Sequence, residues 1–249
     1  MTIHLIADSE LDEDLYRRVH DLLEAVPGIN VFKKNGANQL LFDEEIIEEE
    51  EISDLEEFEK SERPIILPRE IHYKTVLDFP IRRKVLSWKS LFNEIQIKRN
   101  LAEIPQDEFL ILLTPMANRQ NTFAMLDKKN PLNGFIHTSD WDHYLSCDPA
   151  IPIAFEVLEL VLQHYIFYNR PRTGSSLHQK PIGCISDLCA HKKEILLKMR
   201  TADVCPECMS KIEGKISTPE IHHALAILES LRLKMLYAHS FRQSSPPSR

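Results

Sequence analysis

Residues 150–168, AIPIAFEVLELVLQHYIFY, are the stretch that decides the fold. Apolar side chains occupy almost every turn of this segment and leave little polar surface. This pattern predicts a helix that is buried on most sides and lies at the centre of the molecule. Two glutamates, Glu156 and Glu159, stand inside the apolar run. A chain of 249 residues, 43% of them hydrophobic, can bury such a helix in a sizeable core.

Strand-like segments lie upstream of this helix. Residues 109–114, FLILLT, form a short, continuous apolar run that predicts a buried strand, and residues 122–126 and 134–137 predict two more. A further helix is expected over residues 84–104. A last amphipathic helix is expected to begin after Thr218, where Pro219 favours a helix start.

The N-terminal region has the pattern of a strand, a helix and a second strand. Residues 2–7 predict the first strand and residues 29–33 the second. Between them, apolar residues recur at helical spacing, with Ser9 as the expected N-cap and Pro27-Gly28 as the stop. Strands that alternate with helices predict an α/β (α+β) fold.

An acidic segment follows the N-terminal region. Residues 43–63 carry twelve acidic and two basic side chains, a net charge of −10, whereas the whole chain has −8. Mutual repulsion favours a solvated segment, or a helix laid weakly on the surface, over a decoy that mimics nucleic acid. The shifts in composition divide the chain into a strand-helix-strand unit (1–42), the acidic segment (43–63), a core (64–180), a zinc-binding segment with the last helix (181–243) and a tail (244–249).

The composition argues against several functional classes of protein. No uninterrupted apolar run reaches the roughly 18 residues that cross a bilayer, and residues 3–7 lack the pattern of a leader peptide. We therefore expect a cytoplasmic protein with no membrane partner. With six glycines, the chain has no P-loop and no GxGxxG motif. The near-neutral body argues against a nucleic-acid partner, since short basic clusters such as residues 82–84 are typical of a solvated face.

Four of the five cysteines fall into two pairs. Cys184-x4-Cys189 is followed, after fifteen residues, by Cys205-x2-Cys208. A CxxC turn converges two sulfurs on one tetrahedral centre, and a second pair completes the shell, which predicts a structural Zn²⁺ held by four cysteines. Disulfides, redox thiols and unliganded thiols are weaker alternatives. The fifth cysteine, Cys147, is typical of a small buried hydrophobic residue.

Four thiolates around Zn²⁺ leave no open coordination position, so this ion is expected to stabilise the fold and not to perform chemistry. Basic residues lie in or beside the loop between the two cysteine pairs and would offset the residual negative charge of about −2. A solvated basic helix face over residues 192–200 explains them equally well. The residues are His191, Lys192, Lys193, Lys198, Arg200 and Lys211.

The order and spacing of these cysteines resemble those of the archaemetzincins, metzincin-type zinc metallopeptidases. That family carries HExxHxxGxxH for a catalytic zinc, followed by a Cys-x4-Cys pair and a Cys-x2-Cys pair for a structural zinc. The resemblance covers roughly residues 80–215 and extends to the strand that ends in Leu113-Thr114 and to the central helix. It implies a metzincin-like mixed sheet with a central helix and a C-terminal four-cysteine zinc subdomain.

The catalytic motif of that family is degenerate in this chain. Where HExxH belongs, the sequence reads Phe155-Glu156-Val157-Leu158-Glu159, so the glutamate is kept as Glu156 while Phe155 and Glu159 replace the histidines. No GxxH follows, about eighteen additional residues separate the helix from Cys184, and Ala190 replaces the methionine that follows the second cysteine in the family. The resemblance therefore does not imply the known peptidase centre.

Another ligand set could replace the missing histidines. At 100° per residue, Glu156, Glu159 and Gln163 fall within about 60° of one another on the helix, and His164 borders them. With His178 from the following loop, these carboxylates and histidines could hold zinc, manganese or iron. Further candidates lie upstream at His137, Asp140, Asp142 and His143. The alternative, which we favour, is that the helix residues form the wet side of a half-buried helix and that the upstream cluster is a turn.

These observations predict a non-catalytic, archaemetzincin-like zinc protein that acts as an interaction or regulatory module with a protein partner. An active metal-dependent hydrolase is the alternative, with Glu156 or Glu159 as general base and Glu156, Glu159, His164 and His178 as its candidate residues. A zinc-ribbon protein associated with nucleic acid is a third, weaker hypothesis.

Overall fold

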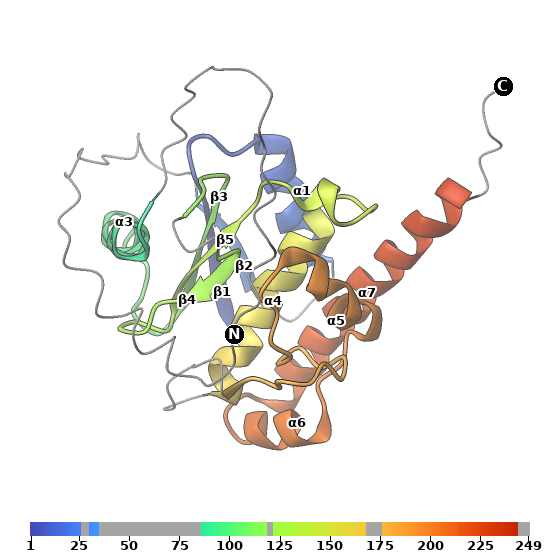
Figure 1. Cartoon of the computed structure of the whole chain (residues 1–249). Helices are drawn as coiled ribbons and strands as arrows, with labels where there is room; N and C mark the ends of the chain where they lie inside the picture. Colours follow the sequence, from blue (N-terminus) through green and yellow to red (C-terminus); the bar gives the residue numbers. More distant parts are fainter. Residues whose placement is uncertain (26–29, 35–85, 119–121, 168–175, 244–249) are drawn as a thin grey trace, which may run out of the picture.

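The computed structural model describes residues 1–25, 30–34, 86–118, 122–167 and 176–243 (Figure 1). The acidic segment and the tail lie outside these residues. The strands are β1 (Thr2–Ala7), β2 (Asn30–Lys34), β3 (Phe109–Thr114), β4 (Ala124–Leu126) and β5 (Asn133–His137). The helices are α1 (Glu13–Glu24), α3 (Trp88–Leu101), α4 (Ala150–Ile166), α5 (Ile195–Thr201), α6 (Pro206–Ile212) and α7 (Thr218–Gln243), with 3-10 turns at Trp141–His143 and Lys192–Glu194.

The strands form one mixed sheet in the order β2-β1-β3-β5-β4. β1 pairs in parallel with β2 and β3, and β3 in parallel with β5, whereas β4 runs antiparallel to β5. β3 lies at the centre, and all six of its residues are buried. A parallel strand covered on both faces needs apolar residues at every position, which explains its unbroken apolar run. The predicted α/β class with a mixed sheet is confirmed.

Helices cover both faces of the sheet (Figure 1). α3 packs on one face, where Leu91 and Ile95 meet Leu112 and Phe135. α1 and α4 cover the opposite face, and α7 packs against the outer side of α4. α4 is thus enclosed between the sheet and the C-terminal helices, and all its residues are buried except His164 and Tyr165. The predicted central helix is confirmed.

Two predicted helix starts differ from the structure. The N-cap of α1 is Asp12 and not Ser9, because the backbone N–H of Leu15 donates to Asp12 Oδ1 at 2.7 Å. α3 begins at Trp88 behind the N-cap Ser87, since Leu86 forms a bridge with Asn118 and is held in extended backbone. Among the described helices, none is long and apolar enough to cross a membrane.

Candidate functional site

Four metal-ligating side chains converge in the C-terminal segment. His178, Cys184, Cys205 and Cys208, the His/Cys group, have their ligand atoms within 4.8 Å of one another. Cys205 is the N-cap of α6 and Cys208 lies in its first turn, so the CxxC spacing turns both sulfurs to one side. Backbone bridges bring the other two ligands to the same place: Cys184 pairs with Asp203, and His178 pairs with Asp187.

The dimensions of the His/Cys group suit one tetrahedral zinc ion. Zinc–nitrogen and zinc–sulfur bonds of about 2.0 and 2.3 Å at tetrahedral angles separate a nitrogen ligand from a sulfur ligand by about 3.5 Å. His178 Nε2 lies 3.5 Å from Cys208 Sγ and 3.9 Å from Cys205 Sγ. A set of three sulfurs and one imidazole is a common zinc shell. A Zn²⁺ cofactor is therefore consistent with the residues present.

Groups around the ligands orient them. Asp187, whose side chain is 2% exposed, lies with Oδ1 3.1 Å from His178 Nδ1. Its other oxygen, Oδ2, accepts from the backbone N–H groups of Ile182 (2.8 Å) and Gly183 (2.7 Å), which fixes the carboxylate. A proton held on Nδ1 by this carboxylate leaves the Nε2 lone pair directed at the sulfurs, as in the carboxylate-histidine-zinc arrangement.

The hydrogen bond between Cys184 and Cys208 moves the pKa values of the two thiols in opposite directions. A hydrogen bond from the Cys208 side chain lowers the pKa of Cys184 to about 5, against the opposing effect of burial, and backbone N–H groups of Cys205 and Ser186 add to the shift. The same hydrogen bond with Cys184, together with burial, raises the pKa of Cys208. Cys184 is thus a thiolate at neutral pH. Metal binding would release the protons of the other thiols.

The fourth predicted cysteine lies elsewhere. Cys189 is not among the converging ligands, and His178 lies where the four-cysteine prediction places it. Cys189 is hydrogen-bonded to Lys198, and burial first, then Glu159, raise its pKa to about 12. It is therefore a protonated, half-buried thiol that packs against the core. The sequence placed His178 among candidate catalytic ligands instead, because nothing in the spacing shows that the loop before Cys184 folds back onto the CxxC turn.

The polar residues of α4 are buried and do not form a wet side. Glu156, Glu159 and Gln163, the α4 stripe, have exposed fractions of 1%, 3% and 1%. Lys198 from α5 donates to Glu159 Oε1 at 2.6 Å, so a buried ion pair joins the two helices. Gln163 Nε2 donates to the same oxygen at 2.9 Å and to the carbonyl of Ile185 at 2.7 Å. The prediction of a solvated stripe was wrong, because the C-terminal segment folds over it.

The four candidate catalytic residues do not come together. His178 belongs to the His/Cys group. His164 lies at the C-terminal end of α4, its ring 5.2 Å from that of Phe109, and burial lowers its pKa. Glu159 is paired with Lys198. Among the described residues, no further group of three or more potential ligands converges as the His/Cys group does.

Two of the basic residues between the cysteine pairs differ from either expectation, whereas His191, Lys193 and Arg200 are exposed as a solvated face would be. Lys192 and Lys198 are buried, with exposed fractions of 8% and 2%. Lys192 meets His137 at the end of β5, and Lys198 meets Glu159 of α4. Although burial opposes its charge, Glu159 and Cys189 raise the pKa of Lys198, so it stays protonated. These two lysines therefore supply positive charge to the interior, where the sequence suggested a solvated helix face.

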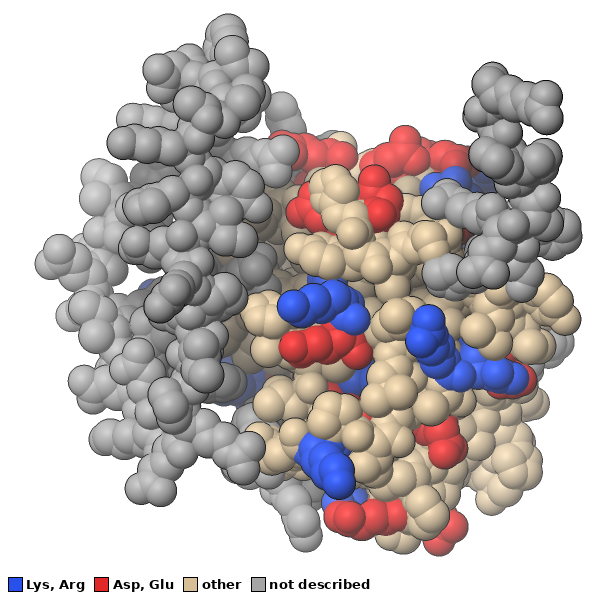
Figure 2. All heavy atoms as spheres, turned by 45° about the vertical axis from the view of Figure 1, so that its right-hand side comes forward, with Lys and Arg blue, Asp and Glu red and all other residues tan. Residues whose placement is uncertain are grey.

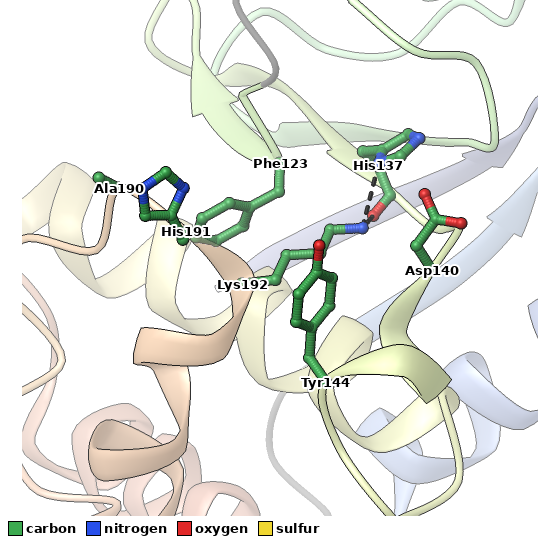
Figure 3. Close-up of a pocket in the computed structure, with 7 residues that line it drawn as sticks. All are labelled: Phe123, His137, Asp140, Tyr144, Ala190, His191 and Lys192. Carbon is green, nitrogen blue, oxygen red and sulfur yellow. Dashed lines mark hydrogen bonds between the residues drawn. The ribbon is translucent and has the colours of Figure 1, made fainter. Parts of the chain in front are cut away.

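The upstream histidine and aspartate candidates separate. His137, at the end of β5, is buried and meets Lys192 Nζ at 3.0 Å through Nδ1 (Figure 3). Asp140 and His143 are exposed, with their closest atoms 3.8 Å apart. Burial, then the nearby charge of Lys192, lower the pKa of His137 to about 4, so its ring is neutral at neutral pH. The lysine partner was not predicted.

No protein-family model matches the sequence, and no curated protein is significantly similar to it. Among solved structures, a zinc-dependent peptidase from Methanocorpusculum labreanum (strain Z) resembles this chain at 18% sequence identity and a TM-score of 0.46. The match covers 85% of this chain and 100% of that chain. A likeness at this identity and score assigns no function, so the chain's own residues have to carry the functional argument.

Proposed function

We propose that this protein is a non-catalytic, archaemetzincin-like zinc-binding protein that acts as an interaction or regulatory module. One observation carries the proposal: Lys198 Nζ lies 2.6 Å from Glu159, the residue that stands in place of the second histidine of HExxH. The ammonium provides the positive charge that a catalytic ion would otherwise bring to this carboxylate. A carboxylate that is already paired inside the protein gains little from a metal ion.

Zinc has a structural role in this proposal. The His/Cys group offers four protein ligands, which fill the tetrahedral shell and leave no position for a substrate or an activated water. The segment that carries Cys184 is tied to α4 through the hydrogen bond from Gln163 to the Ile185 carbonyl. An ion bound there would hold the C-terminal segment over α4 and keep Lys198 beside Glu159.

A protein partner and a cytoplasmic location belong to the same proposal. Three large apolar side chains of the C-terminal segment, Ile182, Leu188 and Leu197, are exposed. On the face seen in Figure 2, acidic side chains gather at the top and basic and acidic ones are mixed below them, which suits a protein partner better than a polyanion. Free thiols such as Cys189 and Cys147 are typical of a reducing compartment.

Metal stoichiometry tests the proposal. Elemental analysis of the purified protein should give one zinc per chain, lost in Cys205→Ser and kept in Glu159→Gln. No cleavage of unfolded protein or peptide substrates should be detected with zinc, manganese or iron added. Two metals per chain, one of them lost in Glu159→Gln, together with peptide cleavage, would establish the alternative of an active metal-dependent hydrolase.

A further inference from the structure

A small cavity of about 60 Å³ opens beside the end of β5 (Figure 3). Its lining includes Phe123, His137, Asp140, Tyr144, His191 and Lys192. The carboxyl ends of parallel strands are where open α/β sheets bind ligands, so the position is a favourable one. The volume has room for a few water molecules, or for the reactive end of a small organic molecule.

Lys192 presents its amine to this cavity in a defined orientation. Its Nζ lies 3.0 Å from His137 Nδ1, contacts the Ser139 carbonyl, and sits 4.5 Å from the centre of the Trp141 ring. His137 Nε2 lies 3.2 Å from the Pro115 carbonyl, so the proton is on Nε2 and Nδ1 accepts from the lysine. These two close acceptors, a longer contact to the His137 carbonyl at 3.4 Å and the face of the Trp141 ring hold the nitrogen in place.

The surroundings favour the neutral amine more than water does. Burial lowers the pKa of Lys192 to about 8, while Asp140 and Glu156 act in the opposite direction. The other titratable groups that face it are His137, which is neutral, and Tyr144 and His191 of the cavity wall. With this pKa, about a tenth of the side chain is unprotonated at pH 7, and in that fraction the nitrogen lone pair is available for bonding.

We propose that Lys192 is a nucleophilic amine that forms an imine with a small, uncharged aldehyde entering this cavity. The lysine nitrogen adds to the carbonyl carbon, the π electrons move to oxygen, and a proton passes from nitrogen to that oxygen. Loss of the hydroxyl as water then forms the C=N bond, so one aldehyde and one amine give one imine and one water. Asp140 and Tyr144 line the same cavity and carry groups that can exchange protons with the adduct.

Reductive trapping tests this proposal on the zinc-loaded wild-type protein. The protein is treated with acetaldehyde and cyanoborohydride at pH 7.5, and alkylation of each lysine is followed over time by peptide mass spectrometry. The exposed neighbour Lys193 is the internal control. At this pH about a quarter of a lysine with a pKa near 8 is unprotonated, against about a thousandth of an ordinary lysine. We therefore expect Lys192 to be alkylated at least about tenfold faster than Lys193.

Two further measurements sharpen the test. The alkylation rate of Lys192 should level off above about pH 9, because the amine is then fully unprotonated. Lys192→Arg should remove the fast-reacting position from the peptide map, whereas Lys193→Arg should leave it. Alkylation of Lys192 no faster than that of Lys193 would overturn the proposal and assign Lys192 a structural role. A fast phase that persists in Lys192→Arg would overturn it as well, and neither result depends on zinc stoichiometry or peptidase activity.

Discussion

The His/Cys group and the α4 stripe differ in the source of their positive charge. Both contain residues that sequence patterns associate with metal ions, and Gln163 links them through the Ile185 carbonyl. In the His/Cys group, four ligand atoms converge with a carboxylate behind the histidine and no lysine among them. In the α4 stripe, Lys198 supplies the cation directly to Glu159.

This difference shows how a metal site and its replacement can be told apart. A site for an ion leaves its lone pairs directed at a common point and fixes each ligand from behind. In the other kind of site the protein itself supplies the cation. Its carboxylates are then paired with ammonium groups, and the protein closes over them. Burial alone does not separate the two, since Cys208 and Glu159 are both buried.

The largest expected effect comes from removing a ligand of the His/Cys group. Cys208→Ser replaces a thiolate by a hydroxyl that stays protonated, so zinc should be lost. Structural zinc contributes about 10–16 kcal/mol of apparent binding free energy in small domains. We expect Tm to fall by about 10 °C or more, measured by calorimetry with zinc present. Cys189→Ser is the matched control and should keep one zinc per chain; zinc loss there would restore the four-cysteine set.

The second effect concerns the ion pair of the α4 stripe. Lys198→Met leaves the buried Glu159 carboxylate without its ammonium, which should lower the free energy of unfolding by about 3–5 kcal/mol. The double change Glu159→Leu with Lys198→Met should recover most of this loss, because both charges are then absent. Urea unfolding of the zinc-loaded proteins measures both. Lys193→Met, at an exposed position, should cost less than about 0.5 kcal/mol.

Lowering the pH should decrease the free energy of unfolding through His137, at the end of β5. Its pKa of about 4 in the folded protein lies below the unfolded value of 6.5, so the unfolded state takes up a proton first as the pH falls. This contribution is fully present above pH 6.5 and is lost as the pH falls toward 4. The loss should reach about 2–3 kcal/mol at pH 4.5.

Urea unfolding at pH 7 and pH 4.5 measures that loss, and His137→Asn should reduce it. The exposed His143 is the matched control, and His143→Asn should retain the full acid sensitivity. Because zinc release by acid affects all three proteins alike, the difference between the variants isolates His137. Equal acid sensitivity in the three proteins would show that His137 is not the titrating group.

The smallest effect comes from the carboxylate behind His178. Asp187→Asn weakens the orientation of the imidazole and should lower zinc affinity at least about tenfold, or about 1.4 kcal/mol. Competition with a chelator at fixed pH measures the change. Glu213→Gln, an exposed position in the same segment, should leave the affinity unchanged. If both variants bind zinc as tightly as the wild type, Asp187 contributes only to the loop that it caps.

Much of the fold could be predicted from the sequence. The apolar run of β3 was predicted residue for residue, and the central α4 was predicted within two residues, because both are buried on all sides and their composition shows it. The N-cap of α1 could not be predicted with the same accuracy, since Ser9 and Asp12 both suit the position. At the candidate site, the sequence placed three of the four converging residues in one motif and put His178 in another.

Local spacing by itself determined the CxxC turn of Cys205 and Cys208 and the one-sided row of polar residues on α4. These are short-range features, in which a few residues fix the geometry of one turn or one helix face. Only the tertiary structure decided that His178 and not Cys189 joins the sulfurs, and that Lys198 closes on Glu159. Those contacts join residues far apart in the chain, and their free energy depends on burial and on charge partners that no local pattern specifies.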